Sequence, residues 1–145
     1  MRRASRWAMG VALIGSAAGS AYAEPNFKEG MWEITMQMQM ANMPMQMPPV
    51  TVRHCLLKKD VVPNTARPGQ DCHVVSHRVS GDTVEWSMRC TDKSGRTMDG
   101  KGQVTYSGES YAGTMNMTMS GSRGDEPATA MSYTMSGRRV GECPK

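Results

Sequence analysis

Methionine is the residue of this sequence whose type and spacing could do chemistry. Sixteen of the 145 residues are methionine. A thioether is a soft, neutral ligand that suits Cu(I) and needs no deprotonation, and it is also oxidised readily to a repairable sulfoxide. Most of the methionines lie two apart, in the groups Met36, Met38, Met40; Met43, Met45, Met47; and Met115, Met117, Met119. The pattern therefore favours one of three roles, which are a Cu(I) site, an oxidant sink or hydrophobic packing.

The spacing separates two kinds of methionine. Residues two apart lie on one face of a β-strand, and the methionines at 36–40 continue a face that holds Trp32 and Ile34. These are predicted to be core, and Trp32 to be buried. Met43, Met45 and Met47 have the opposite parity and lie among prolines, which predicts a turn or bulge near residues 41–42 and an exposed loop after it. These three loop methionines are the candidate Cu(I) ligands.

The other candidate ligands and catalytic groups are poorly placed. His73 and His77 lie on one face of a predicted strand but roughly 13 Å apart along it, too far to share one ion. All three histidines, His54 included, are expected to be packed or surface residues. Glu33 and Glu85 fall on faces assigned to solvent, where general acid catalysis is not expected. The sequence contains no G-x-S-x-G elbow and no glycine-rich run before a helix. We expect no enzyme and no catalytic residues, with Cu(I) the one alternative cofactor.

Four cysteines predict two disulfides in an oxidising compartment. Their spacing contains no C-x-x-C, which disfavours zinc ribbons and thioredoxin-type pairs, and the residues are Cys55, Cys72, Cys90 and Cys143. A hairpin turning at Gly81-Asp82 places Cys72 and Cys90 on opposite faces. That register favours Cys55–Cys72 with Cys90–Cys143, because bonded cysteines need their Cβ atoms about 3.8 Å apart. A bulge in the hairpin would reverse this preference.

The first 23 residues are typical of a secretory signal peptide. Arg2, Arg3 and Arg6 precede an uncharged apolar stretch that ends in the small-x-small site 21–23. The stretch is shorter than the roughly 20 apolar residues of a spanning helix. Removal of the 23-residue signal peptide lowers the net charge from +4 to +1, because 14 basic and 13 acidic residues remain. We expect a periplasmic or secreted monomer without a membrane span, and no nucleic-acid partner.

Residues 24–145 are predicted to form one all-β domain. Period-two alternation recurs between glycine, asparagine, aspartate and proline turns, whereas helical periodicity is nearly absent. About seven strands joined mostly by short turns predict an antiparallel meander that forms a small barrel or a sandwich. The elements that carry the methionines are strands near residues 32–40, 111–119 and 131–135.

Several short motifs occur in an order that resembles family 3617 of the domains of unknown function, exported proteins of Gram-negative bacteria. They are FKEGMWEIT at 27–35, MPMQMPP at 43–49, CL at 55–56, GDTVEW at 81–86, GQVTYSGESYAGTM at 102–115 and SGRRVGEC at 136–143. The resemblance implies a periplasmic location and supplies no catalytic residues. We expect a non-catalytic protein that holds an apolar ligand or partner; the alternatives are Cu(I) binding at the methionine-proline loop and a methionine oxidant sink.

Overall fold

The computed structural model describes residues 24–41, 43–63, 69–120 and 127–145. The signal peptide predicted at residues 1–23 lies outside these ranges. The described residues contain strands and no helix, which confirms the all-β prediction. The seven strands are β1 (Gly30–Met40), β2 (Val50–Leu56), β3 (Gln70–Ser80), β4 (Thr83–Asp92), β5 (Thr97–Tyr106), β6 (Ser110–Met119) and β7 (Thr129–Gly141).

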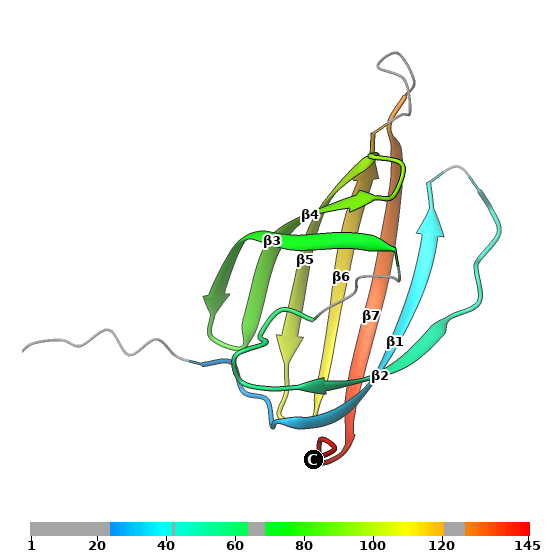
Figure 1. Cartoon of the computed structure of the whole chain (residues 1–145). Coiled ribbons are helices and arrows are strands. Elements are labelled where there is room, and N and C mark those ends of the chain that lie inside the picture. The colour runs from blue at the N-terminus through cyan, green and yellow to red at the C-terminus, as the bar shows by residue number, and fades with distance from the viewer. Residues whose placement is uncertain (1–23, 42, 64–68, 121–126) are drawn as a thin grey trace, which may run out of the picture.

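The strands form one antiparallel sheet in the order β2-β1-β7-β6-β5-β4-β3. Strands β3 to β7 follow one another as a meander, and the hairpin β1–β2 joins it through the pairing of β1 with β7. The sheet curls so that its two edge strands, β2 and β3, come forward of the other five (Figure 1). They do not pair with each other, so the fold is a half-barrel with one concave face.

Two glycines let bulky rings lie flat on the concave face. A Cβ at Gly102 would lie 2.2 Å from the ring of Trp86, and one at Gly137 would lie 2.2 Å from the ring of Tyr111. Each glycine sits directly across from the aromatic residue it accommodates. Glycine inside a strand marks such a close approach, so these positions let the curled sheet pack its aromatic side chains.

All four cysteines are in disulfides, as predicted, but the favoured pairing is wrong. The bonds are Cys55–Cys143 and Cys72–Cys90. A bulge between Val74 and Ser76 shifts the β3–β4 register and sets Cys72 directly opposite Cys90. One extra residue moves the rest of a strand to the other face. The two disulfides indicate an oxidising, non-cytoplasmic compartment.

The same bulge changes the positions of the histidines. His77 pairs with Trp86 on the concave side, whereas His73 pairs with the exposed Arg89 on the other side. The prediction that both share a face is therefore wrong. The conclusion that they do not bind one ion together gains support, because they now project from opposite faces.

Candidate functional site

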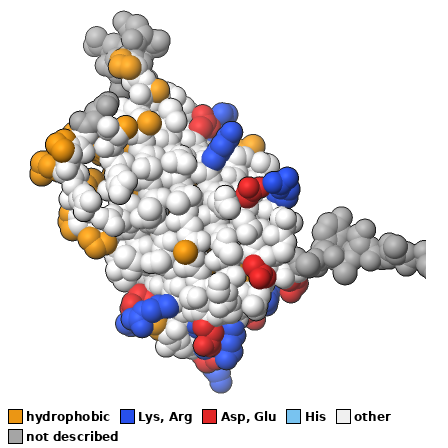
Figure 2. Space-filling model, turned by 180° about the vertical axis from the view of Figure 1, so that it is seen from behind, with side chains coloured by type: hydrophobic (Ala, Val, Ile, Leu, Met, Phe, Trp, Pro, Cys, Tyr) orange, Lys and Arg blue, Asp and Glu red, His pale blue; other side chains and the backbone are white. Residues whose placement is uncertain are grey.

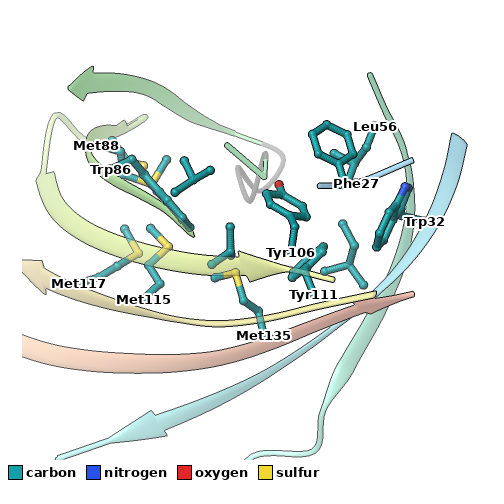
Figure 3. Close-up of a cluster of buried hydrophobic side chains, with 14 of the residues drawn as sticks. Phe27, Trp32, Leu56, Trp86, Met88, Tyr106, Tyr111, Met115, Met117 and Met135 are labelled. Atoms are coloured by element: carbon teal, nitrogen blue, oxygen red, sulfur yellow. The ribbon is translucent and has the colours of Figure 1, made fainter. Parts of the chain in front are cut away.

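The concave face has two chemically different ends, and one of them is closed by aromatic packing. Trp32 and Tyr106 are 0% and 1% exposed, and Phe27 stacks on Tyr106 with ring centroids 4.7 Å apart. Tyr111 stacks on Trp32 at 5.7 Å. Figure 3 shows these four rings and Leu56 gathered on one side of the cluster. We call this group, Phe27, Trp32, Leu56, Tyr106 and Tyr111, the closed end; the burial predicted for Trp32 is confirmed.

Hydrogen bonds fasten chain segments over the closed end. The Tyr106 hydroxyl donates to the carbonyl of Val61 at 2.8 Å, and Trp32 Nε1 donates to the carbonyl of Lys28 at 3.1 Å. Arg139, whose side chain is 10% exposed, donates from Nε to the carbonyl of Glu29 at 2.8 Å. Burial raises the pKa of Tyr106 above its ordinary value and so keeps its hydroxyl neutral. This end is therefore a structural core.

The other end of the concave face is lined by methionine and only partly covered. Register sets Met36 opposite Met135, Met38 opposite Tyr133, and Met40 opposite Met131. Residues directly opposite share one face. In Figure 3 the labelled methionines Met115 and Met117 lie away from the closed end, with Met135 between the two groups. We call the half-buried residues here the open end; they are Met36, Met38, Met40, Met119 and Tyr133.

Methionine is the commonest residue of this interior, in which only Ile34, Leu56, Val84 and Val104 are buried branched aliphatic residues of the described ranges. Residues 24–145 contain 14 methionines, two leucines and one isoleucine. A buried methionine loses more rotamer freedom than leucine or isoleucine does, so packing alone would favour the branched residues. Thioether side chains instead adapt to irregular partners and are common at surfaces that accept varied ligands. The composition therefore suits an interior that changes shape when something binds.

Exposed apolar side chains lie mainly on two segments. One is the edge strand β2 with the residues before it from position 43, and the other is the edge strand β3. Val52 sits opposite Ile34 and Val50 opposite Met36, so both face the concave side from β2. Val74 faces Met88 from β3. Of the eight large hydrophobic residues exposed in the described ranges, seven belong to these segments, namely Met43, Met45, Met47, Val50, Val52, Val74 and Val75, and the eighth is Val140. From behind, hydrophobic side chains also gather along one margin, while charged ones lie elsewhere in mixed groups (Figure 2).

The predicted Cu(I) ligands lie in an exposed segment between β1 and β2. Met43, Met45 and Met47 are 62%, 77% and 45% exposed, which confirms the predicted exposure. The amide of Met43 donates to the carbonyl of Met40 at 3.3 Å, a reverse turn that carries Met43 back toward the end of β1. The exposed segment is thus continuous with the open end.

Charged groups lie on other parts of the molecule. Arg138 and Arg53 both donate to the carboxylate of Glu33 and hold its pKa below the ordinary value. A carboxyl with a lowered pKa is a poor general acid at neutral pH. One depression of about 640 Å³ lies over Arg78, Glu85, Lys101 and further residues, and another of about 650 Å³ lies around Arg139. Both are outside the open end.

Within the described ranges, no three His, Cys, Asp or Glu side chains gather to hold a metal ion. The same ranges contain no helix with the length and apolar character needed to span a membrane.

The sequence analysis did not identify the exposed valines of the two edge strands, Val50, Val52, Val74 and Val75, as a group. The signal for Val50 and Val52 was their alternation, whereas only the bulge brings Val74 to the concave side.

The fold and the site together define a small all-β protein with an apolar concave face. The chain belongs to the family described as "Protein of unknown function (DUF3617)", whose model matches residues 27–143. No curated protein and no solved structure matches the chain.

Proposed function

We propose that this protein is an exported, non-catalytic binding protein that holds the apolar chain of a small amphiphile at the open end. The observation that carries the proposal is the contrast in cover along one concave face. The closed end excludes solvent completely at Trp32, whereas Met36, Met38, Met40, Met119 and Tyr133 stay partly exposed. Leaving these apolar groups in water costs roughly 25 cal/mol per Å², and a bound chain would recover that cost.

The location of these residues supports the same conclusion. Contiguous apolar patches on soluble proteins mark binding sites, and here the exposed valines border the concave face from both unpaired edges. Small barrels either fill with side chains or hold one ligand. This half-barrel fills one end and leaves methionines at the other, so the ligand class is a flexible hydrocarbon chain.

A fluorescent fatty acid tests the proposal. The protein should quench or enhance cis-parinaric acid in a saturable way, and Met38→Glu should weaken binding about tenfold or more, because a carboxylate would have to be buried against the chain. Gln39→Glu is the matched control, since it adds the same charge one residue away on an exposed position of the opposite face. Equal affinity in the two variants, or no saturable binding by the unmodified protein, would refute the proposal.

Cu(I) binding by Met43, Met45 and Met47 is the second candidate function, favoured by their exposure. Soft thioethers prefer Cu(I) to Zn(II), which is better served by thiolate or imidazole. If these three residues are the site, replacing all of them by Leu abolishes Cu(I) binding with little change in melting temperature, because an exposed loop has few packed contacts. Competition with a Cu(I) chelator would show unchanged affinity if the loop is not the site.

An oxidant sink requires only exposed thioethers. Peroxide treatment with mass spectrometry would then find sulfoxide first at Met43, Met45 and Met47.

A further inference from the structure

A buried group of thioethers converges over Gly100, on the concave face of β5. Gly100 lies directly between Met88 of β4 and Met117 of β6. From the point that a Cβ of Gly100 would occupy, Met115 Cε lies at 3.0 Å, Met88 Cγ at 3.2 Å and Met117 Cγ at 3.4 Å. Each of these carbons is bonded to its residue's sulfur. Three thioethers from two strands, β4 and β6, therefore pack against one position of β5, and each sulfur is one bond from a carbon that approaches Gly100.

The surroundings of this group suit a soft monovalent cation. Met88, Met115 and Met117 are 5%, 2% and 9% exposed. Trp86 lies two residues before Met88, on the same face of β4. Its ring lies over Gly102, the next residue after Gly100 on the concave side of β5. An indole face attracts a cation, more strongly when water is excluded. Figure 3 shows Trp86 and the three methionines on the same side of the cluster.

We propose that Met88, Met115 and Met117 form a thioether site for Cu(I), with Trp86 beside it. Neutral sulfur ligands suit Cu(I), while hard ions need oxygen ligands, and no carboxylate or histidine cluster accompanies the site in the described part of the chain. The site differs from the exposed loop at residues 43–47 in being enclosed. It also does not depend on the proposed ligand, because an apolar chain would occupy the open end.

The proposed site predicts which methionines are needed for Cu(I) binding. One Cu(I) per chain should bind in competition with a Cu(I) chelator, and Met88→Leu/Met117→Leu should reduce that binding below detection. The double variant Met131→Leu/Met135→Leu is the matched control, since both residues are buried on the same face, 8% and 3% exposed, and neither supplies any of the three atoms nearest to the Cβ point of Gly100. Met-to-Leu exchange conserves volume and is tolerated well in protein cores, so both variants should fold.

A measurement on the unmodified protein removes any dependence on folding of the variants. With ¹³C-methyl-labelled methionine, addition of Ag(I), a redox-stable analogue of Cu(I), should shift the methyl signals of Met88, Met115 and Met117 before all others. Cu(I) affinity unchanged by Met88→Leu/Met117→Leu would overturn the site. First shifts at Met43, Met45 and Met47 would overturn it in favour of the loop. Failure of this site would leave fatty-acid binding unaffected, so the two proposals fail separately.

Discussion

The closed and open ends of the half-barrel share one sheet and one concave face, yet they differ in their packing and in the chain segments that cover them. At the closed end, aromatic rings pack on one another and main-chain carbonyls accept hydrogen bonds from Trp32, Tyr106 and Arg139. At the open end, the methionines of β1 and β6 pack beside Tyr133 without a covering segment in the described ranges. Aromatic packing and the hydrogen bonds that fasten it are therefore concentrated at one end of the concave face.

This division has a physical basis in the side chains themselves. Aromatic rings bury a large area with few rotatable bonds, which favours a single packed arrangement. Methionine has three rotatable bonds and a polarizable sulfur, so it fills irregular space and repacks readily. Regions that bind ligands are drawn from the less stable parts of a protein. The open end is therefore the part of the concave face that can change without unfolding the sheet.

The largest expected effect is loss of the closed end. Trp32→Ala should lower the free energy of unfolding by about 3–5 kcal/mol, because it removes a fully buried ring and leaves a cavity. Met38→Ala, on the same strand at the half-buried open end, should cost about 1 kcal/mol. Denaturant unfolding of both variants decides this. Equal losses would erase the distinction between the two ends.

Overpacking provides a sharper test with a control on the same strand. Gly137→Ala should cost about 1–3 kcal/mol, because the added Cβ would meet the ring of Tyr111 at 2.2 Å, and that ring packs on Trp32. Gly141→Ala adds the same atom where nothing lies within 4 Å, and should be nearly neutral. Thermal melts compare the two. A stable Gly137→Ala protein would mean that the closed end tolerates displacement of Tyr111.

The two buried tyrosines should respond oppositely to loss of their hydroxyls. Tyr106→Phe should cost about 1 kcal/mol because the hydrogen bond to Val61 is lost. The hydroxyl of Tyr111 is buried and has no hydrogen-bond partner among the described residues, so Tyr111→Phe should be neutral or stabilising by about 1 kcal/mol. Chemical denaturation measures both. Destabilisation by Tyr111→Phe would reveal a partner of that hydroxyl.

The smallest effect concerns the turn between β4 and β5. The hydroxyl of Ser94, together with Arg96, lowers the pKa of Asp92 from 3.8 to about 2. A lowered folded-state pKa stabilises the protein above the unfolded-state pKa, and that contribution is lost as the pH falls from about 4 to 2. The melting-temperature advantage over Asp92→Asn should therefore shrink across this interval. A constant difference would contradict the role of the charged carboxylate.

Local pattern predicted most of the strands and the burial of their faces. The strands near residues 32–40, 111–119 and 131–135 follow from alternation and turn residues. The bulge near Val75 could not be predicted in this way, because the run Val74-Val75-Ser76 does not show which residue is the extra one. That single residue decides the disulfide pairing and the face of His73.

The difference between the two ends was only partly predictable. The sequence shows which residues share a concave face, but the cover over that face comes from residues distant in the chain, such as Val61 above Tyr106. The convergence over Gly100 likewise needs three strands in exact register. Contacts of this kind depend on how the sheet curls, which no local periodicity records.

Methionine methyl spectroscopy with a long-chain fatty acid is the sharpest test of ligand binding at the open end. With ¹³C-methyl methionine and a titration of palmitate, we expect saturable shifts at Met36, Met38, Met40 and Met119, the half-buried methionines of the open end. The indole signal of Trp32 should stay unchanged, because the closed end excludes the ligand. Shifts confined to Met43, Met45 and Met47, or saturable changes at Trp32 without changes at the open end, would refute binding at the open end.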